Sequence, residues 1–389
     1  MRVAMVGPFG LRPRGTMSVR ALPMAQALAR RGHNVTLLLP PWQNPEDSGR
    51  TEEQDGVCIE NISLPPGVPL LFHALTALRL VRRAVAHQPD VVHLFKPKAY
   101  SGLTHWLLAR LPRGRRPRLV VDTDDWEGAG GWNDLADYSA AQRRFFSWQE
   151  RWGLTHADAV TVASRTLESL VWALGVPPAR VVYVPNGFPH PHLIQSSDLE
   201  SEPGQPLLLL YTRFFEFPVD RVLAVLRQVR ERVPEARLLV VGKGLFGEEA
   251  ELLAAASRAG LDDAIEYAGW VDPEDLPRTF ARATVALYPF DDTLINRTKC
   301  PVKLLDLLSA GLPVVAEAVG EVGEMIQDGR TGCLVPPGDV TAFAAAVVAL
   351  LENPARRRRV GSAAAQDVLT RRAWDRLVEV VEAAYRSGT

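Results

Sequence analysis

The sequence has few cysteines, no long apolar run and almost no net charge, and each shortage argues against a class of protein. Its three cysteines, Cys58, Cys300 and Cys333, are odd in number and far apart. This arrangement offers neither the paired spacing of a zinc site nor a disulfide framework, and it favours a reducing compartment. The formal net charge of −1 gives no global field that would attract nucleic acid.

Apolar segments are all too short for a membrane protein. None reaches the roughly 18 uncharged residues of a transmembrane helix, and the apolar run within residues 1–7 is too short for a signal peptide. We therefore expect a cytoplasmic protein. With 389 residues, 47% of them hydrophobic and 23% charged, a soluble globular chain of two ordinary domains is predicted.

The first half of the chain alternates between strand-like and helical segments. A strand at residues 3–7 stops in a loop rich in Gly, Pro and Arg, and a helix over about 18–30 leads to a second strand at 34–39. The loop departs from the Gly-x-Gly-x-x-Gly fingerprint, so a dinucleotide site is not supported. Further strands are predicted at 90–95 and 119–122, within 157–164 and within 181–187, and helices at 70–86 and 99–110. Ser164 is expected to cap a helix that follows the third of these strands. This alternation is typical of a doubly wound α/β domain.

A second domain of the same kind follows a linker. Residues 189–206 are rich in Pro, Ser and acids and have no periodicity, which indicates a linker. Strand and helix then alternate again. The sequence thus predicts an N-terminal domain at 1–188, a C-terminal domain at 207–370 and a final helical segment at 371–389. The strands expected after the linker are 207–211, 237–241, 285–288 and 313–316, with a helix at 219–233 and a turn and strand within 328–335.

The stretch from Thr298 to Ala316 carries the strongest chemical signal. It reads as a loop, a helix that can start at Pro301, and a strand. A helix N-terminus offers unpaired N–H groups and the positive end of a dipole, which favour an anion. Lys303 adds a charge there, and Asp306 follows on the same helical face. Two readings stay open at this point, a site for a phosphorylated ligand with vicinal hydroxyls and an ordinary solvated Lys–Asp pair.

This stretch resembles the signature of the family-four retaining glycosyltransferases, which have the GT-B fold. Their signature runs Glu-x(7)-Glu and closes on a segment like Leu-Leu-Glu-x-x-Ala-x-Gly-x-Pro-Val-Val. Leu304 to Val315 matches the closing half, with Asp306 in place of the second Glu, and the first Glu falls at Thr298. The resemblance extends over nearly the whole chain. It implies two Rossmann-like domains facing across a cleft, with a final helix that crosses back to the first.

The resemblance also implies a function and a set of residues. The expected enzyme is a retaining, hexosyltransferase-like glycosyltransferase that moves a sugar from a nucleotide-diphosphate-sugar donor to a hydroxyl acceptor, needing no metal and no other cofactor. The family pattern gives catalytic roles to Arg213, Lys303 and Asp125. It gives donor contacts to Gly15, Thr16, Gly242, Trp270, Val271, Thr298, Lys299, Cys300, Val302, Leu304 and Asp306.

Three positions depart from the family pattern and define the alternatives. The family has a Lys where this chain has Pro218, and commonly a His where it has Asp125. Together with Thr298 these departures motivate a nucleotide-sugar-binding protein with degraded catalysis. Another GT-B enzyme, such as an epimerase, is a second alternative. Asp122 and Asp124 form the Asp-x-Asp pattern of the other glycosyltransferase fold, but GT-B enzymes rarely use a bound metal.

Several basic residues and one histidine are interpreted as structural. His93 is expected to be a satisfied residue at a strand end, and Lys96 and Lys98 to be solvated charges. The arginines of residues 110–118 are expected to form an exposed loop. Its functional alternative is peripheral contact with an anionic membrane, since some family members use membrane-bound acceptors. The sequence does not indicate an oligomeric state.

Overall fold

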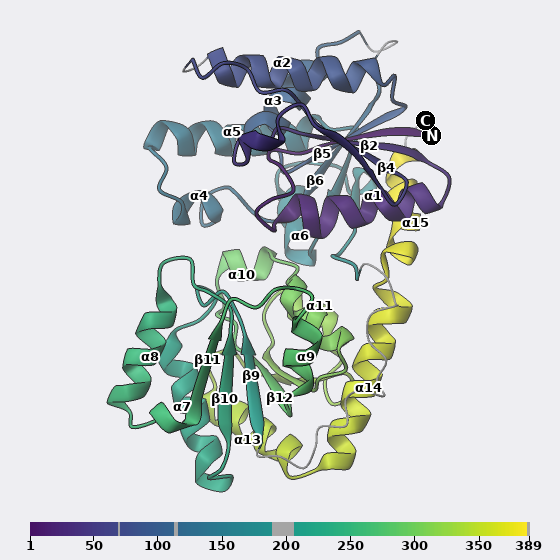
Figure 1. The fold of residues 1–389 in the computed structure, drawn as a ribbon. Helices are drawn as coiled ribbons and strands as arrows, with labels where there is room; N and C mark the ends of the chain where they lie inside the picture. The colour runs from purple at the N-terminus through teal and green to yellow at the C-terminus, as the bar shows by residue number, and fades with distance from the viewer. Residues whose placement is uncertain (69–70, 113–115, 189–205, 387–389) are drawn as a thin grey trace. The chain divides into compact units, whose positions relative to one another are not determined.

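A computed structural model describes residues 1–68, 71–112, 116–188 and 206–386 of the chain (Figure 1). Its contacts divide the chain into two compact units. Unit 1 comprises Met1–Pro189, Thr298–Cys300 and Trp374–Thr389, and unit 2 comprises His190–Arg297 and Pro301–Ala373. The predicted linker at 189–206 lies outside the described residues except for its last member.

Unit 1 is built on an eight-stranded sheet with the order β3-β4-β2-β1-β5-β6-β7-β8. All its neighbouring strands are parallel except β3 and β4. The central strands are almost wholly apolar because both of their faces are buried. The strands are β1 (Arg2–Val6), β2 (Asn34–Leu39), β3 (Thr51–Gln54), β4 (Val57–Asn61), β5 (Val91–Phe95), β6 (Arg118–Thr123), β7 (Ala159–Val162) and β8 (Val181–Tyr183).

Helices cover the unit 1 sheet in two groups. Helix α3 packs against both α2 and α5, and α1 packs against α15. In Figure 1 these two groups lie on opposite sides of the sheet. The helical segments are η1 (Met17–Ala21), α1 (Leu22–Arg30), η2 (Pro45–Asp47), α2 (Leu71–Ala86), α3 (Ala99–Leu108), α4 (Trp132–Leu135), α5 (Ala140–His156), α6 (Arg165–Ala173), η3 (Pro178–Arg180) and α15 (Trp374–Arg386).

The helix expected over about 18–30 forms in two parts. Its first part, η1, is a π-helical turn in which the Leu22 N–H bonds to the carbonyl of Met17, five residues back. Pro23 explains the break, because it has no N–H to donate to the preceding turn. The predicted helix cap at Ser164 is confirmed, since its Oγ accepts a hydrogen bond from Leu167 N at 3.1 Å.

A buried polar chain ties the last helix to the unit 1 sheet. Arg20 is fully buried and forms a bidentate pair with Asp122 at 2.8 and 2.7 Å. Thr161 donates to the same carboxylate and lies 3.1 Å from His93 Nε2, whose Nδ1 lies 2.8 Å from the Tyr385 hydroxyl of α15. Burial lowers the pKa of His93 to about 4, so the ring is neutral and serves a structural role, as predicted.

Unit 2 is a six-stranded parallel sheet with the order β11-β10-β9-β12-β13-β14. Its strands are β9 (Leu207–Tyr211), β10 (Arg237–Val241), β11 (Ile265–Gly269), β12 (Val285–Tyr288), β13 (Val314–Glu317) and β14 (Cys333–Val335). Its helices are α7 (Val219–Arg232), α8 (Glu248–Arg258), η5 (Asp262–Ala264), α9 (Leu276–Ala281), α10 (Leu294–Thr298), α11 (Val302–Ser309), α12 (Val322–Met325), α13 (Val340–Leu351) and α14 (Pro354–Arg371). The prediction of two doubly wound α/β sheets is confirmed. Within the described residues, no helix is long and apolar enough to cross a bilayer.

Candidate functional site

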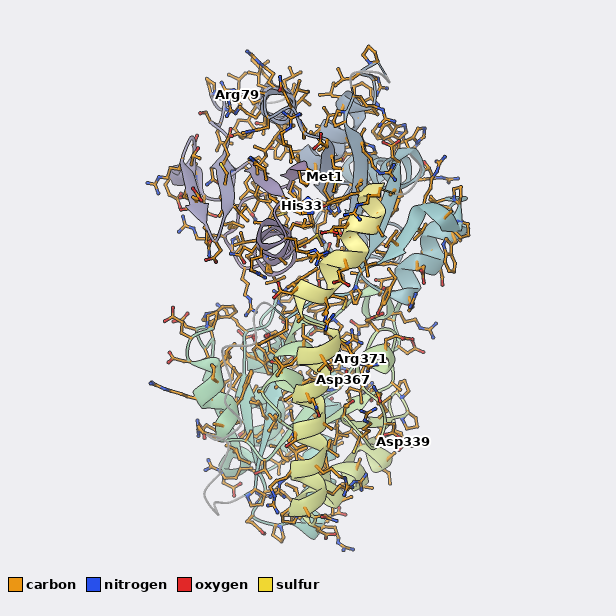
Figure 2. The ribbon with its side chains drawn as sticks, turned by 90° about the vertical axis from the view of Figure 1, so that its right-hand side faces the viewer. Met1, His33, Arg79, Asp339, Asp367 and Arg371 are labelled. Carbon is orange, nitrogen blue, oxygen red and sulfur yellow. The ribbon has the colours of Figure 1, made fainter. Side chains whose placement is uncertain are left out.

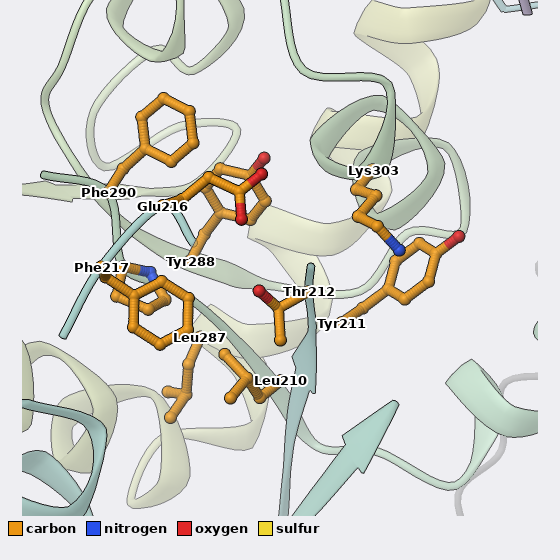
Figure 3. Close-up of a pocket in the computed structure, with 10 residues that line it drawn as sticks. Leu210, Tyr211, Thr212, Glu216, Phe217, Leu287, Tyr288, Phe290 and Lys303 are labelled. Carbon is orange, nitrogen blue, oxygen red and sulfur yellow. The ribbon is translucent and has the colours of Figure 1, made fainter. Parts of the chain in front are cut away.

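A pocket lies at the carboxyl edge of the unit 2 sheet, where the strand order changes direction (Figure 3). Strands β10 and β11 follow β9 on one side of it, and the next strand, β12, pairs with β9 on its other side. Ligands of open α/β sheets bind at such switch points. The pocket is lined by Leu210, Tyr211, Thr212, Glu216, Phe217, Leu287, Tyr288, Pro289, Phe290 and Lys303.

Lys303 reaches this pocket from the first turn of α11. Its Nζ lies 3.3 Å from the centre of the Tyr211 ring, the last residue of β9 (Figure 3). Pro301 is the N-cap residue of α11 and provides no side-chain hydrogen bond to the first turn. In any α-helix the N–H groups of the first turn have no carbonyl partner within the helix itself. A cation and a helix N-terminus at a switch point together suit an anionic ligand.

The pocket wall at β12 is fixed by a buried carboxylate. Glu317, the last residue of β13, is fully buried, and its Oε2 accepts hydrogen bonds from Phe290 N at 2.6 Å and Arg221 Nη1 at 2.9 Å. Its other oxygen accepts from Gly338 N at 2.6 Å. A satisfied buried ion pair of this kind rigidifies the loop that carries it. Phe290 is thus held in place before any ligand arrives.

The strand ends beside the pocket show why glycine stands at position 242. Gly242 has a φ of +126° at the end of β10, and a Cβ there would lie 2.0 Å from the carbonyl oxygen of Thr212. No other residue fits without moving β9. Trp270 is exposed and Val271 half-buried just after β11. Arg213 follows β9 by two residues, but it is not among the residues that line the pocket.

The signature stretch is divided between the two units. Thr298, Lys299 and Cys300 pack within unit 1. Ser164 Oγ donates to the Thr298 carbonyl at 2.7 Å, and Asn186 Nδ2 donates to the Cys300 carbonyl at 2.7 Å. The second part of the signature belongs to unit 2. Val302 begins α11, the Leu304 side chain is fully buried in the core, and Asp306 is half-buried on the same helix.

The other predicted residues lie at the carboxyl edge of the unit 1 sheet. Gly15 precedes η1, and Thr16 is its N-cap residue. Thr16 Oγ1 donates to Asp124 Oδ2 at 2.6 Å. Asp125 accepts from Lys96 Nζ at 2.6 Å, and Lys96 also lies 3.2 Å from Asp124 Oδ1. The structure thus brings Thr16, Asp124 and Asp125 together at the end of β6.

The prediction that Lys96 and Lys98 are solvated is wrong. The Lys96 side chain is 12% exposed and the Lys98 side chain 14% exposed. Glu127 accepts from Lys98 Nζ at 2.7 Å, and the Tyr138 ring lies 4.7 Å from the same ammonium. The sequence shows two lysines in a loop, but it does not show that this loop packs against the carboxylates that follow β6.

Charges in this unit 1 cluster shift one another's protonation. Burial raises the pKa of Asp124 to about 6, and it raises the pKa of the neighbouring Glu150 to about 8. Burial works against the charged form of Lys96 as well. The carboxylates of Asp124, Asp125 and Glu127 outweigh that effect and raise the pKa of Lys96 well above its ordinary value. The cluster is therefore largely neutralised from within.

The residues that sequence reasoning missed are those of the pocket wall, above all Tyr211, Tyr288 and Phe290. Tyr211 and Tyr288 are the last residues of β9 and β12. The switch-point rule applied to the predicted strands could have found them. Within the described residues, no group of three or more His, Cys, Asp or Glu side chains is arranged to hold a metal. Asp122 of the Asp-x-Asp pattern is paired with Arg20 instead.

Comparison with known protein families decides the identity of the chain. Residues 15–187 match the glycosyl transferase 4-like domain, and residues 205–353 match the glycosyl transferases group 1. The two matches together cover most of the chain. The protein is a family-four glycosyltransferase. This confirms the resemblance on which the site residues were predicted, and it is consistent with the two-sheet GT-B architecture of the glycosyltransferase.

Two curated relatives of the glycosyltransferase match over most of their length. A phosphatidyl-myo-inositol mannosyltransferase of Mycobacterium leprae is 27% identical over 380 residues, covering 95% of this chain and 92% of its own. A glycogen synthase of Mycobacterium tuberculosis is 24% identical, covering 93% and 88%. These relatives use different acceptors by their names, so likeness to them does not identify the acceptor of this glycosyltransferase.

Solved structures show the same fold. Sucrose-phosphate synthase from Thermosynechococcus elongatus has a TM-score of 0.75 at 21% identity, covering 99% of this chain and 98% of its own. Anabaena HepE in complex with UDP-glucose has a TM-score of 0.70 at 18% identity, with 98% of each chain covered. The two-sheet architecture of the glycosyltransferase is therefore that of known GT-B enzymes.

Proposed function

We propose that the protein is a retaining glycosyltransferase that moves a sugar from a nucleotide-diphosphate-sugar donor to a hydroxyl acceptor. The observation that carries the proposal is Lys303, held over Tyr211 at the unit 2 switch point with the α11 N-terminus beside it. A diphosphate is the anion that this arrangement suits. Relatives named as mannosyltransferases and HepE with bound UDP-glucose support a nucleotide-sugar donor.

Transfer requires that the leaving diphosphate be stabilised while the bond between sugar and oxygen breaks. Charge grows on the diphosphate in the transition state, so a fixed cation near it lowers the barrier. Lys303 is this cation in our proposal, with the N–H groups at Val302 and Lys303 as further donors. Arg213, two residues after the end of β9, is proposed to add a second charge. An acceptor hydroxyl that attacks on the face of the leaving group gives retention.

A nucleotide-sugar-binding protein without transfer activity is the second candidate. The observation in its favour is Thr298, which replaces the first signature Glu and is fully buried within unit 1. Its carbonyl is occupied by Ser164 Oγ. A threonine side chain carries no charge, so Thr298 cannot supply the charged contact that the family makes with the transferred sugar. Transfer by the purified protein separates this candidate from the first.

The test begins with a thermal-shift screen of nucleotide sugars, followed by product analysis with the best binder. Transfer with the same anomeric configuration in donor and product is expected. Lys303→Ala is expected to reduce turnover by about 100-fold or more, the cost of removing one transition-state charge. Lys243→Ala, an exposed lysine that does not line the pocket, is the matched control.

Three outcomes would overturn parts of the proposal. Inverted product configuration would exclude retention. Conversion of the donor without an acceptor would indicate an epimerase. Unchanged turnover in Lys303→Ala, with unchanged thermal stability, would remove Lys303 from the mechanism. A cytoplasmic location belongs to the same proposal, because the chain's three free cysteines suit a reducing compartment.

A further inference from the structure

Glu216 is the acidic residue of the unit 2 pocket. Within the part of the chain that the structure describes, it is the one lining residue with a carboxyl group, and Lys303 is the one with a basic group. The two side chains come from different elements, Lys303 from α11 and Glu216 from the loop between β9 and α7 (Figure 3). Groups of opposite charge at one pocket suit a ligand that has an anionic part and a separate part that donates hydrogen bonds.

The loop that carries Glu216 is held in one conformation. Phe214 is buried with a φ of +70°, and its N–H donates to Thr212 Oγ1 at 2.7 Å. The Glu216 carbonyl accepts hydrogen bonds from Asn296 Nδ2 and from Asp291 N, both at 2.9 Å. A left-handed conformation in a residue other than glycine persists only where its surroundings impose it, and such strain gathers at ligand sites. The position of Glu216 is thus set before a ligand binds.

Two neighbouring carboxylates serve the fold instead. Asp291 forms an ion pair with Arg221, and the same arginine donates to Glu317 at 2.9 Å. Glu317 also accepts two backbone N–H groups, so both of its oxygens are occupied within the protein. Neither Asp291 nor Glu317 lines the pocket. Glu216 differs from them because its side chain forms part of the pocket wall, where a ligand can contact it.

We propose that Glu216 binds hydroxyl groups of the transferred sugar and thereby determines which sugar the donor carries. This role rests on the proposed function, since it concerns the sugar of the proposed donor. A carboxylate only accepts hydrogen bonds, and like charges repel, so Glu216 cannot face the diphosphate that Lys303 is placed to meet. The hydroxyl groups of a sugar are suitable partners, because hydrogen bonds to a charged acceptor are about twice as strong as neutral ones.

The aromatic side chains of the pocket suit the same ligand. Tyr288 and Phe290 both line it, with ring centres 5.5 Å apart. Their rings offer apolar surface to the C–H groups of a sugar ring. Aromatic rings also exclude water, and a charged hydrogen bond is stronger in such surroundings than in bulk solvent. A few polar groups on an apolar wall are the usual means by which a pocket selects the orientation of its ligand.

Titration calorimetry on the full chain tests this role by comparing each nucleotide sugar with its nucleoside diphosphate. The probes are UDP-glucose with UDP and GDP-mannose with GDP, and the sugar that binds the native chain more tightly is used for the variants. Glu216→Gln keeps the size of the side chain and removes its charge. It should weaken binding of the nucleotide sugar by about tenfold and leave binding of the nucleoside diphosphate within about twofold. Thermal melting shows that the variant is folded.

Deoxy analogues of the donor identify the hydroxyl group that Glu216 contacts. The native chain should bind the analogue that lacks this hydroxyl about tenfold more weakly than the full donor. Glu216→Gln should bind that analogue and the full donor within about twofold of each other, because the contact is already lost. A variant that only disturbs the fold would lose the same factor with every analogue.

Asp367→Asn is the matched control. Asp367 is 8% exposed and Glu216 7%, so both variants neutralise a buried carboxylate of unit 2. Asp367 lies on α14, where it pairs with Arg371 at 2.7 Å, and it does not line the pocket (Figure 2). The control should bind nucleotide sugar like the native chain. An equal loss in Asp367→Asn and Glu216→Gln would overturn the proposed role.

The binding measurements separate failure of this role from failure of the proposed function. Equal losses for nucleotide sugar and nucleoside diphosphate in Glu216→Gln would assign the residue to the nucleoside or to the support of Lys303, and would overturn sugar recognition alone. Unchanged affinity of Glu216→Gln for every donor analogue would do the same. If the native chain binds no nucleotide sugar of the screen, the proposed function and the role of Glu216 are both wrong.

Discussion

The carboxyl edges of the two sheets use the same topology in different ways. In unit 1 the loops after β5 and β6 form a cluster in which Lys96 is surrounded by carboxylates at 2.6 to 3.5 Å. In unit 2 the corresponding edge keeps a pocket lined by Lys303 and Tyr211. A buried lysine in the first case stabilises the fold, and a lysine at a pocket in the second is placed to meet a ligand. The strand order determines where a site can form at a sheet edge, and the loops at that edge determine whether the site is filled by an ion-pair cluster or left as a pocket.

The largest expected effect tests the structural side of this comparison. Lys96→Met should lower the free energy of unfolding by about 3–5 kcal/mol, because it leaves buried carboxylates without their cation. Urea unfolding followed by circular dichroism measures the change. The exposed Lys243→Met is the control and should stay within about 0.5 kcal/mol of the native chain. A Lys96→Met protein as stable as the control would show that the cluster is solvated and the comparison wrong.

Glu150, in the same cluster, should make the free energy of unfolding depend on pH. Its folded pKa of about 8 lies above the ordinary value of 4.5, so the fold favours the protonated form. The contribution of Glu150 to the free energy of unfolding is complete below pH 4.5. It is lost as the pH rises from 4.5 toward 8, by roughly 1.4 kcal/mol for each pH unit. Glu150→Gln should flatten this decline and leave the protein more stable at pH 8. Chemical unfolding at a series of pH values measures both slopes.

Removal of an exposed carboxylate provides the control for this pH series. Glu379→Gln on α15 should leave the slope as it is in the native chain, because the Glu379 side chain is 54% exposed. An equal slope in Glu150→Gln and the native protein would mean that Glu150 is already ionised in the fold.

The smallest expected effect concerns the unit 2 pocket, where the contact between Lys303 and Tyr211 is predicted to contribute to donor affinity. Tyr211→Leu removes the ring under the Lys303 ammonium, an interaction of about 1 kcal/mol. Donor affinity should fall by roughly fivefold. Tyr211→Phe keeps the ring and should stay within about twofold of the native chain. Titration calorimetry with the best nucleotide sugar measures the difference. Equal losses in both variants would assign the effect to the hydroxyl group.

The sequence predicted the sheets well because their strands are apolar runs bounded by turn residues. The bounds of β2, β9 and β10 agree with the predicted segments, and Ser164 caps its helix as expected. Lys303 was identified because a helix start after a strand is a local pattern. Lys96 was misjudged because its environment comes from carboxylates about thirty residues later in the sequence. Contacts between distant loops leave no local pattern to read.

The environments of two further residues could not be predicted, because they too depend on contacts between distant parts of the sequence. Arg20 lies on a helical segment where an arginine usually faces solvent, yet it is fully buried against Asp122, more than a hundred residues away. Tyr211 looked like the end of an ordinary strand, and only the strand order places it beside Lys303. Propensity identifies the elements of this fold, whereas the neighbours of its charged side chains follow from topology.

The last helix has a consequence for how the protein is made. Trp374, Val378 and Val381 of α15 are buried in the core that unit 1 builds around β1 and α1. The ribosome synthesises this helix after the strands of both sheets, so the core of unit 1 is incomplete until residues 374–386 have left the exit tunnel. A gene truncated before residue 374 would encode every strand of both sheets, yet its product would expose an apolar surface to chaperones and proteases.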